Sequence, residues 1–238
     1  MFSGLVEACV EVRSVEPLGA EGQGVRLWLT APDLTPEQGA WEPVLGESIA
    51  VAGCCLTVIE IGPDGGVAFD LSQETLDCTW LGDLEPGRRM NLERSVRPVD
   101  RLGGHLVSGH VDAVGRIAEI QDPGDGGRLF TFEGPADFAG YLVPKGSVTV
   151  DGISLTVVRP RGSSFDVAVI PETLARTNLG TAEPGQRVHL EADMIGKWVE
   201  RILEARGLVQ PRSDWARRLS QTARGARPRL RSPGTARS

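Results

Sequence analysis

Along much of the chain, hydrophobic side chains recur at every second position. The alternation is clear at residues 25–29, 49–51, 148–150 and 165–169. Because successive side chains of a strand point to opposite faces, this period of two predicts short strands with one buried face. Glycine- and proline-rich turns, such as the GPDGG segment at 62–66, separate these runs at intervals typical of small antiparallel barrels. The pattern therefore predicts an all-β fold.

One stretch near the C-terminus has a helical period instead. Its apolar residues fall at i, i+3, i+4, i+7 and i+8: Ile195, Trp198, Val199, Ile202 and Leu203. Asp193 precedes them as a plausible N-cap and Gly207 can end the helix. We expect its apolar face to pack either on another subunit or back on its own chain. Shorter helical turns are expected after the two Glu-Thr-Leu segments at 74–76 and 172–174.

The chain also repeats itself with an offset of about 100 residues. Ordered blocks recur at 2–6 and 107–111, at 53–58 and 152–157, at 74–76 and 172–174, and at 85–93 and 183–191. Two copies of this length indicate a duplicated domain rather than a stacked solenoid. The predicted organisation is an N-terminal barrel (1–97), a C-terminal barrel (98–193), a helix (194–207) and an Arg-rich, disordered tail (208–238).

Charge is divided unevenly between these parts. The chain has 238 residues and a net charge of −7, but the segment from Leu208 onward carries +7, which leaves −14 on the rest. An acidic body with one Tyr and six Phe offers little for phosphate contact or base stacking. We therefore expect no nucleic-acid partner. Because small barrels have many functions, a barrel module that binds nucleic acid or protein is kept as a distant alternative function.

Other features narrow the protein class. No apolar run approaches the roughly 20 residues that cross a bilayer, and the N-terminus shows no secretory signal, so no membrane association and a cytoplasmic location are expected. The four cysteines, Cys9, Cys54, Cys55 and Cys78, form neither CxxC pairs nor a His/Cys cluster. We expect reduced thiols and no metal site.

Two segments carry a resemblance to a known family. The opening MFSGLVE (1–7) and the linker GGHLVSGHVD (103–112), together with the repeat, resemble the alpha-type riboflavin synthases over residues 1 to 206. The resemblance implies two six-stranded antiparallel Greek-key β-barrels in tandem plus a C-terminal α-helix. It also implies a homotrimer, possible association with lumazine synthase, and no cofactor.

The family's reaction converts two molecules of 6,7-dimethyl-8-ribityllumazine into riboflavin and 5-amino-6-(D-ribitylamino)uracil by four-carbon transfer. Each barrel would bind one lumazine, and the active site would lie between the N-terminal barrel of one subunit and the C-terminal barrel of its neighbour. The acidic C7 methyl group of one lumazine would attack the other. Holding two reactants in place can supply about 7 to 11 kcal/mol, so juxtaposition is the main task of the protein.

The resemblance also implies site residues. In the C-terminal half these are Lys145, Asp151, Ser154, Thr156, Ile170, Thr173 and Asp193, and in the N-terminal half Ser48, Cys55, Thr57 and Thr75. Phe2, Ser3 and Gly4 would close over the neighbouring site, and His105 and His110 would lie near substrate. Cys55, Ser154, His105 and Asp193 are the catalytic candidates.

Several roles have alternatives. Cys55 could activate a nucleophile or stabilise an adduct as a thiolate, or be an inward-facing barrel residue beside an outward-facing Cys54. His105 is the best base by intrinsic pKa, although a lone His is more often structural. Ala52 stands where the family has Asn or Asp. A chromophore-binding antenna protein on the same fold, without catalysis, is the closest alternative function.

Overall fold

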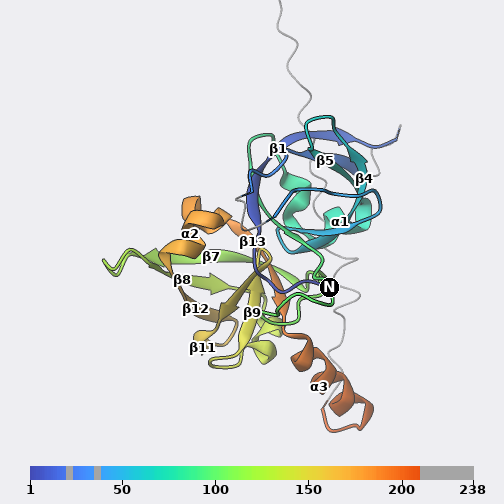
Figure 1. Ribbon diagram of the computed structural model, residues 1–238. Helices are drawn as coiled ribbons and strands as arrows, with labels where there is room; N and C mark the ends of the chain where they lie inside the picture. The colour runs from blue at the N-terminus through green and yellow to red at the C-terminus, as the bar shows by residue number, and fades with distance from the viewer. Residues whose placement is uncertain (20–23, 35–38, 210–238) are drawn as a thin grey trace, which may run out of the picture.

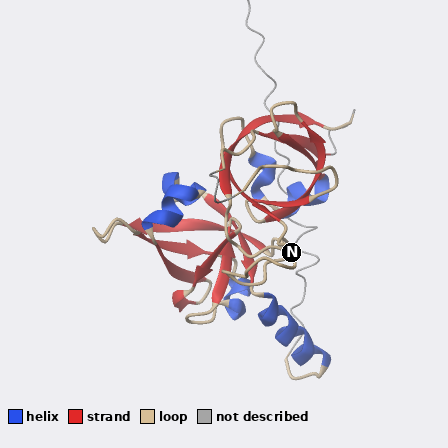
Figure 2. Ribbon diagram, in the orientation of Figure 1, coloured by secondary structure: helices blue, strands red, loops and turns tan. Residues whose placement is uncertain are grey.

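The computed structural model describes residues 1–19, 24–34 and 39–209, and it shows two barrels in tandem followed by a helix (Figures 1 and 2). In the N-terminal half, antiparallel strands form a closed barrel in the order β1-β2-β5-β4-β3-β6. The strands are β1 (Ala8–Pro17), β2 (Gly24–Leu29), β3 (Ser48–Val51), β4 (Cys54–Ile61), β5 (Val67–Ser72) and β6 (Arg89–Arg94). Figure 2 shows this barrel nearly end-on, as a ring of strands.

The C-terminal half repeats this arrangement. Its strands are β7 (Ala113–Gln121), β8 (Arg128–Glu133), β9 (Ser147–Val150), β10 (Ile153–Thr156), β11 (Val158–Arg161), β12 (Ser164–Val169) and β13 (Arg187–Ala192), with the order β10-β9-β13-β7-β8-β12-β11. Only Val157 separates β10 from β11, and together they correspond to β4. The predicted pair of similar antiparallel barrels is confirmed, with one strand of the second divided in two.

Each barrel has its own hydrophobic core, built from the alternating residues that predicted the strands. Leu27 and Phe69 are fully buried in the first core, and Phe132 and Phe165 in the second. Burying one such side chain contributes about 1.5–3 kcal/mol. The two cores are separate, so each barrel buries its own apolar residues.

Helical turns follow both Glu-Thr-Leu segments, as predicted, but each segment also lies within a short helix that the sequence analysis did not predict. The Glu-Thr-Leu segments lie within α1 (Gln73–Cys78) and α2 (Pro171–Arg176) rather than before them. In α1 the reason is the N-cap Ser72, whose side chain accepts a hydrogen bond from the backbone N–H of Thr75. The short 3-10 helices η2 (Trp80–Asp83) and η4 (Asn178–Thr181) follow, and η3 (Ala136–Tyr141) lies between β8 and β9.

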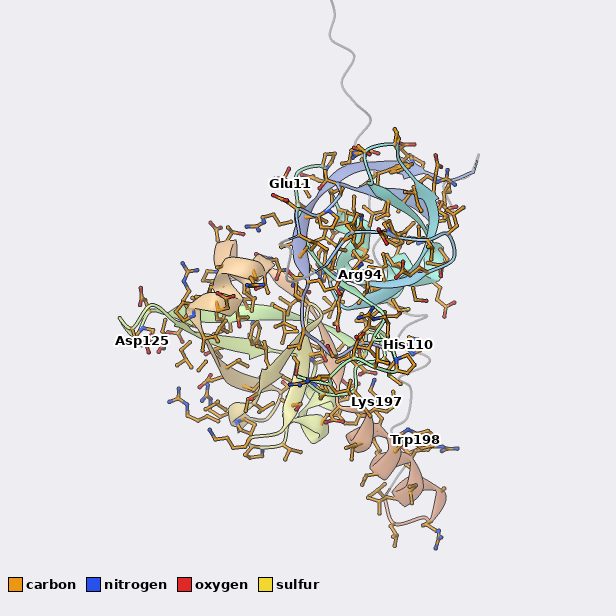
Figure 3. All side chains as sticks on the ribbon, viewed as in Figure 1. Glu11, Arg94, His110, Asp125, Lys197 and Trp198 are labelled. Carbon is orange, nitrogen blue, oxygen red and sulfur yellow. The ribbon has the colours of Figure 1, made fainter. Side chains whose placement is uncertain are left out.

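The predicted C-terminal helix is confirmed as α3 (Met194–Ala205), with Asp193 as its N-cap and Gly207 beyond its end at φ +69°. The helix extends away from the second barrel, and Trp198 points outward from it (Figure 3). Trp198 is 63% exposed and Ile202 56%. The described residues of the chain thus leave this apolar face largely uncovered. The predicted tail lies outside the described residues from position 210.

The barrels meet back to back at two equivalent hairpin turns. Ala52-Gly53 joins β3 to β4 and Asp151-Gly152 joins β9 to β10, each with positive φ at both residues, as a two-residue hairpin turn requires. A Cβ on Gly53 would lie 2.6 Å from the backbone nitrogen of Gly152, and one on Gly152 would lie 2.8 Å from that of Gly53. Glycine at both positions therefore permits the contact between the barrels.

Candidate functional site

Each barrel presents a matching row of three residues across neighbouring strands, on the side opposite its core. We call these the N row (Cys55 on β4, Ala50 on β3 and Glu93 on β6) and the C row (Ser154 on β10, Thr149 on β9 and Glu191 on β13). Ala50 is the cross-strand partner of Cys55 and Glu93, and Thr149 that of Ser154 and Glu191. The duplication therefore repeats one surface with different side chains.

The glutamate of the N row anchors the N-terminal segment. Glu93 accepts hydrogen bonds from the backbone N–H and the hydroxyl of Ser3, both at 2.7 Å, and from the backbone N–H of Gly4 at 2.9 Å. Burial raises the pKa of Glu93, and these donors oppose the rise. Because charge-assisted hydrogen bonds are among the stronger ones, the segment is held firmly on the barrel.

The glutamate of the C row holds the linker in the same way. Glu191 accepts from the backbone N–H and hydroxyl of Ser108, both at 2.7 Å, and from the backbone N–H of Gly109 at 3.1 Å. Burial raises the pKa of Glu191 as well. The two Ser-Gly segments, Ser3-Gly4 and Ser108-Gly109, are therefore equivalent. We call these segments and the glutamates that hold them the frame of the site.

Each Ser-Gly segment also reaches the row of the other barrel. The backbone N–H of Ser154 donates to the carbonyl of Gly4, and that of Cys55 to the carbonyl of Gly109, both at 2.8 Å. The predicted closing segment, Phe2 to Gly4, thus lies beside Ser154 of its own chain. This crossed connection fixes the two rows relative to each other.

The linker brings His105 onto the C row. Its Nδ1 lies 2.7 Å from Ser154 Oγ and its Nε2 lies 3.1 Å from Thr149 Oγ1. Burial lowers the pKa of His105, and the carboxylate of Asp193 opposes this. A Cβ on Gly104 would lie 2.1 Å from the carbonyl oxygen of Ser3, so glycine lets the linker approach. The structure thus places two predicted catalytic residues, Ser154 and His105, in direct contact.

The N row is covered by apolar groups instead. Cys55 faces outward and is half-buried, next to a cluster of Phe2, Ala50 and Val107. Cys54 is the inward-facing cysteine, and burial raises its pKa to about 12. The orientation is the reverse of the alternative in which Cys55 faces inward, and it leaves Cys55 on the surface that the resemblance assigns to substrate.

Three other predicted residues, Ser48, Thr57 and Thr156, share a face with the rows, because each lies two positions along a strand from a row residue. Ser48 is the cross-strand partner of Thr57. Thr156 is exposed on β10, Thr75 and Thr173 lie in α1 and α2, Ile170 is the N-cap of α2, Lys145 is exposed in the turn before β9, and Asp193 caps α3. His110 is also exposed. None of these residues contacts Cys55 or Ser154 through a side-chain hydrogen bond within the described part of the chain.

Asp151 requires a correction. Its side chain is fully buried where the barrels meet, and its oxygens accept from Trp80 Nε1 at 3.1 Å, the backbone N–H of His189 at 2.8 Å and Asn178 Nδ2 at 2.8 Å. Burial raises its pKa to about 6. The carboxylate therefore joins the two barrels and faces no open surface on which a substrate could lie.

The same junction contains a buried histidine that the sequence analysis did not assign. His189 Nε2 accepts from the backbone N–H of Trp80 at 3.0 Å, Nδ1 lies 2.7 Å from the carbonyl of Ala52, and the ring stacks on Trp80 at 4.8 Å. Asn91, its equivalent in the other half, accepts from the backbone N–H of Asn178 at 2.7 Å. Burial lowers the pKa of His189 to about 3.

The sequence analysis did not single out three residues of the two rows: Glu93, Glu191 and Thr149. The repeat contained the signal for the glutamates, since both halves have Glu at this place and Ser-Gly near the start. Nothing in the sequence indicated Thr149. Among the described residues, no three metal-ligating side chains gather at one place, and no helix has the length and apolar character needed to span a membrane.

Comparisons with known proteins agree with this arrangement. The family model described as the lumazine binding domain matches twice, at residues 3–95 and 108–193. The chain is 44% identical over 210 residues to riboflavin synthase of Mycobacterium tuberculosis, which covers 87% of this chain and 100% of the relative. It is 37% identical over 214 residues to riboflavin synthase of Actinobacillus pleuropneumoniae, with coverages of 90% and 95%.

Solved structures share the fold of this chain. LumP complexed with riboflavin has a TM-score of 0.70 at 25% identity, and LumP complexed with 6,7-dimethyl-8-(1'-D-ribityl) lumazine has 0.68 at 23%. Both comparisons cover 81% of this chain and 99% of the other. The repeated domain and the similarity over nearly the whole of its relatives show that the chain belongs to the riboflavin synthases, a family of enzymes built from two lumazine-binding domains.

Proposed function

We propose that the protein is a riboflavin synthase that converts two molecules of 6,7-dimethyl-8-ribityllumazine into riboflavin and 5-amino-6-(D-ribitylamino)uracil. The observation that carries this proposal is the pair of equivalent rows, one on each lumazine-binding domain, with unequal side chains. The reaction uses two identical molecules in different roles, one as donor and one as acceptor of four carbons. Two related but unequal sites suit that requirement.

The molecule that accepts the four carbons must lose a proton from its C7 methyl group, because this carbon attacks the ring of the other molecule. The resulting negative charge spreads into its own ring. Hydrogen-bond donors aimed at that charge lower the barrier. The C row has such a donor in the hydroxyl of Ser154, which His105 contacts, whereas the N row has a thiol and apolar neighbours. In this proposal the C-terminal domain holds the molecule on which charge develops, and Cys55 faces the other molecule.

Assembly of the active site between subunits is part of the proposal. The uncovered face of α3, with Trp198 and Ile202, is suited to packing against a second copy. A homotrimer would bring the N row of one subunit to the C row of the next. Positioning of both ring systems would then supply much of the rate enhancement.

The alternative is a chromophore-binding protein without turnover, as the structural similarity to LumP allows. The polar C row and the higher identity to riboflavin synthases favour the enzyme. Incubating the purified protein with 6,7-dimethyl-8-ribityllumazine and following riboflavin fluorescence decides between them. Formation of riboflavin and the ribitylaminouracil in equal amounts supports the proposal, and stoichiometric binding with no riboflavin would refute it.

A further inference from the structure

We infer that Thr149 is a positioning residue that sets the tautomer of His105 and thereby turns the hydroxyl of Ser154 toward substrate. This inference rests on the proposed function. Thr149 lies in the middle of the C row and its side chain is 1% exposed. Its hydroxyl lies 3.1 Å from His105 Nε2, and His105 Nδ1 lies 2.7 Å from Ser154 Oγ. His105 therefore bridges the buried hydroxyl of Thr149 and the half-buried hydroxyl of Ser154.

The direction of these hydrogen bonds follows from the burial of Thr149. Within the described residues, His105 Nε2 is the one hydrogen-bond partner of the Thr149 side chain. A buried hydroxyl that donates to nothing is disfavoured, so Thr149 donates its proton and Nε2 accepts it. In the neutral ring, the proton must then be on Nδ1. Burial favours this neutral form because it lowers the pKa of His105.

This tautomer of His105 determines where the hydroxyl proton of Ser154 points. Nδ1–H donates to Ser154 Oγ, which leaves the serine O–H free to point away from the ring. Ser154 is half-buried on the outward face, so its proton is directed toward the place where substrate would lie. A hydroxyl that already accepts a hydrogen bond is also a better donor, because the two bonds polarise each other. His105 thus acts through Ser154 as a fixed donor rather than as a base.

The N row supports this assignment by contrast. The residue equivalent to Thr149 is Ala50, and among the described residues the Cys55 thiol, which packs against Phe2 and Val107, forms no hydrogen bond with an imidazole. The same frame therefore carries the hydroxyl–imidazole–hydroxyl line on one domain only. This difference is expected if only one of the two bound molecules needs a donor aimed at developing charge.

The test compares Thr149→Val, which removes the hydroxyl at nearly constant volume, with Thr149→Ser, which keeps it. Thr131→Val is the matched control, since Thr131 is in the same barrel on β8 and its hydroxyl donates to Asp166 at 2.9 Å. We expect Thr149→Val to lower kcat about tenfold with KM changed by less than about twofold. Thr149→Ser and Thr131→Val should keep kcat near the wild-type value.

A second measurement reads the tautomer directly in the resting protein. The chain has three histidines, so 15N NMR of the ring nitrogens can follow His105, identified by its loss in His105→Gln. Wild type and Thr149→Ser should show a protonated Nδ1, and Thr149→Val should lose this single form. An unchanged tautomer in Thr149→Val, or an equal loss of kcat in Thr131→Val, would overturn the inference. If the wild-type protein forms no riboflavin, the proposed function fails, while the tautomer still tests the role of Thr149.

Discussion

The buried pair His189 and Asp151 at the barrel junction predicts an unusual dependence of stability on pH. Burial lowers the pKa of His189 to about 3 and raises that of Asp151 to about 6. The histidine contributes stability above its unfolded pKa of about 6.5, and this is lost as the pH falls toward 3. Asp151 has the opposite effect on the stability of the fold. Its contribution is fully present below the unfolded pKa of about 3.9 and is lost as the pH rises through about 6. Between pH 6.5 and 4.5 the two effects oppose each other.

The magnitudes follow from linkage at about 1.36 kcal/mol per pH unit for one proton. Over this interval the unfolded chain takes up the His189 proton and the folded protein does not, which removes about 2 kcal/mol of stability. The folded protein takes up the Asp151 proton well before the unfolded chain does, which restores about 2 kcal/mol. In wild type the two contributions therefore nearly cancel.

Asp151→Asn and His189→Asn separate these contributions. Asn is already the equivalent of His189 in the other half, at position 91. We expect Asp151→Asn to lose about 2 kcal/mol more than wild type between pH 6.5 and 4.5, and His189→Asn to lose about 2 kcal/mol less. Urea unfolding at both pH values and one chain concentration gives the free energies. Parallel pH responses of wild type and Asp151→Asn would refute the assignment of these buried groups.

Three further changes test the frame of the site. Gly109→Ala should lower both the thermal stability and the rate of riboflavin formation, because φ is +81° and the new Cβ would lie 2.7 Å from Cβ of Cys55. Gly124→Ala is the control for backbone strain in thermal unfolding, because its φ is +84° and its new Cβ would have no atom within 4 Å. Glu93→Gln should reduce the free energy of unfolding by about 1.5–3 kcal/mol, because one charged acceptor of the N-terminal segment is lost; a change below 0.5 kcal/mol would contradict that role. Trp198→Ser should weaken self-association in sedimentation velocity while the circular dichroism of the barrels is retained, and an unchanged sedimentation coefficient would exclude α3 as the oligomer contact.

The sequence predicted those features that depend on neighbouring residues or on the repeat. The period of two gave the strands, the repeat gave two similar barrels, and the spacing after Asp193 gave α3. The paired glutamates were not predicted, since each contacts a segment more than 80 residues away in the chain. Such contacts depend on which distant segments of the chain the folded barrel brings together, and a linear pattern does not contain that information.

Asp151 shows why a motif alone can mislead about a role. It precedes a glycine beside Ser154, so its place in the chain resembled that of a substrate contact. In the structure its φ is +45°, which a hairpin turn needs and which Asp tolerates better than most residues. Asp151 therefore suits both the backbone conformation of the turn and the hydrogen bonds of the barrel junction. Ala52 has the same φ but no polar side chain, and its backbone carbonyl oxygen lies within hydrogen-bond distance of His189 Nδ1.

The differences between the N row and the C row lie at positions where the fold tolerates them. The cores need apolar residues of fixed volume, and the frame needs its glutamates, Ser-Gly segments and turn glycines, because a change in any of these disturbs packing or leaves a buried group unpaired. The first two positions of each row touch neither core. Replacing Ala50 and Cys55 by Thr149 and Ser154 in the second copy therefore alters chemistry at little expense in stability. A duplicated domain can in this way gain two unequal sites while both halves keep the same fold.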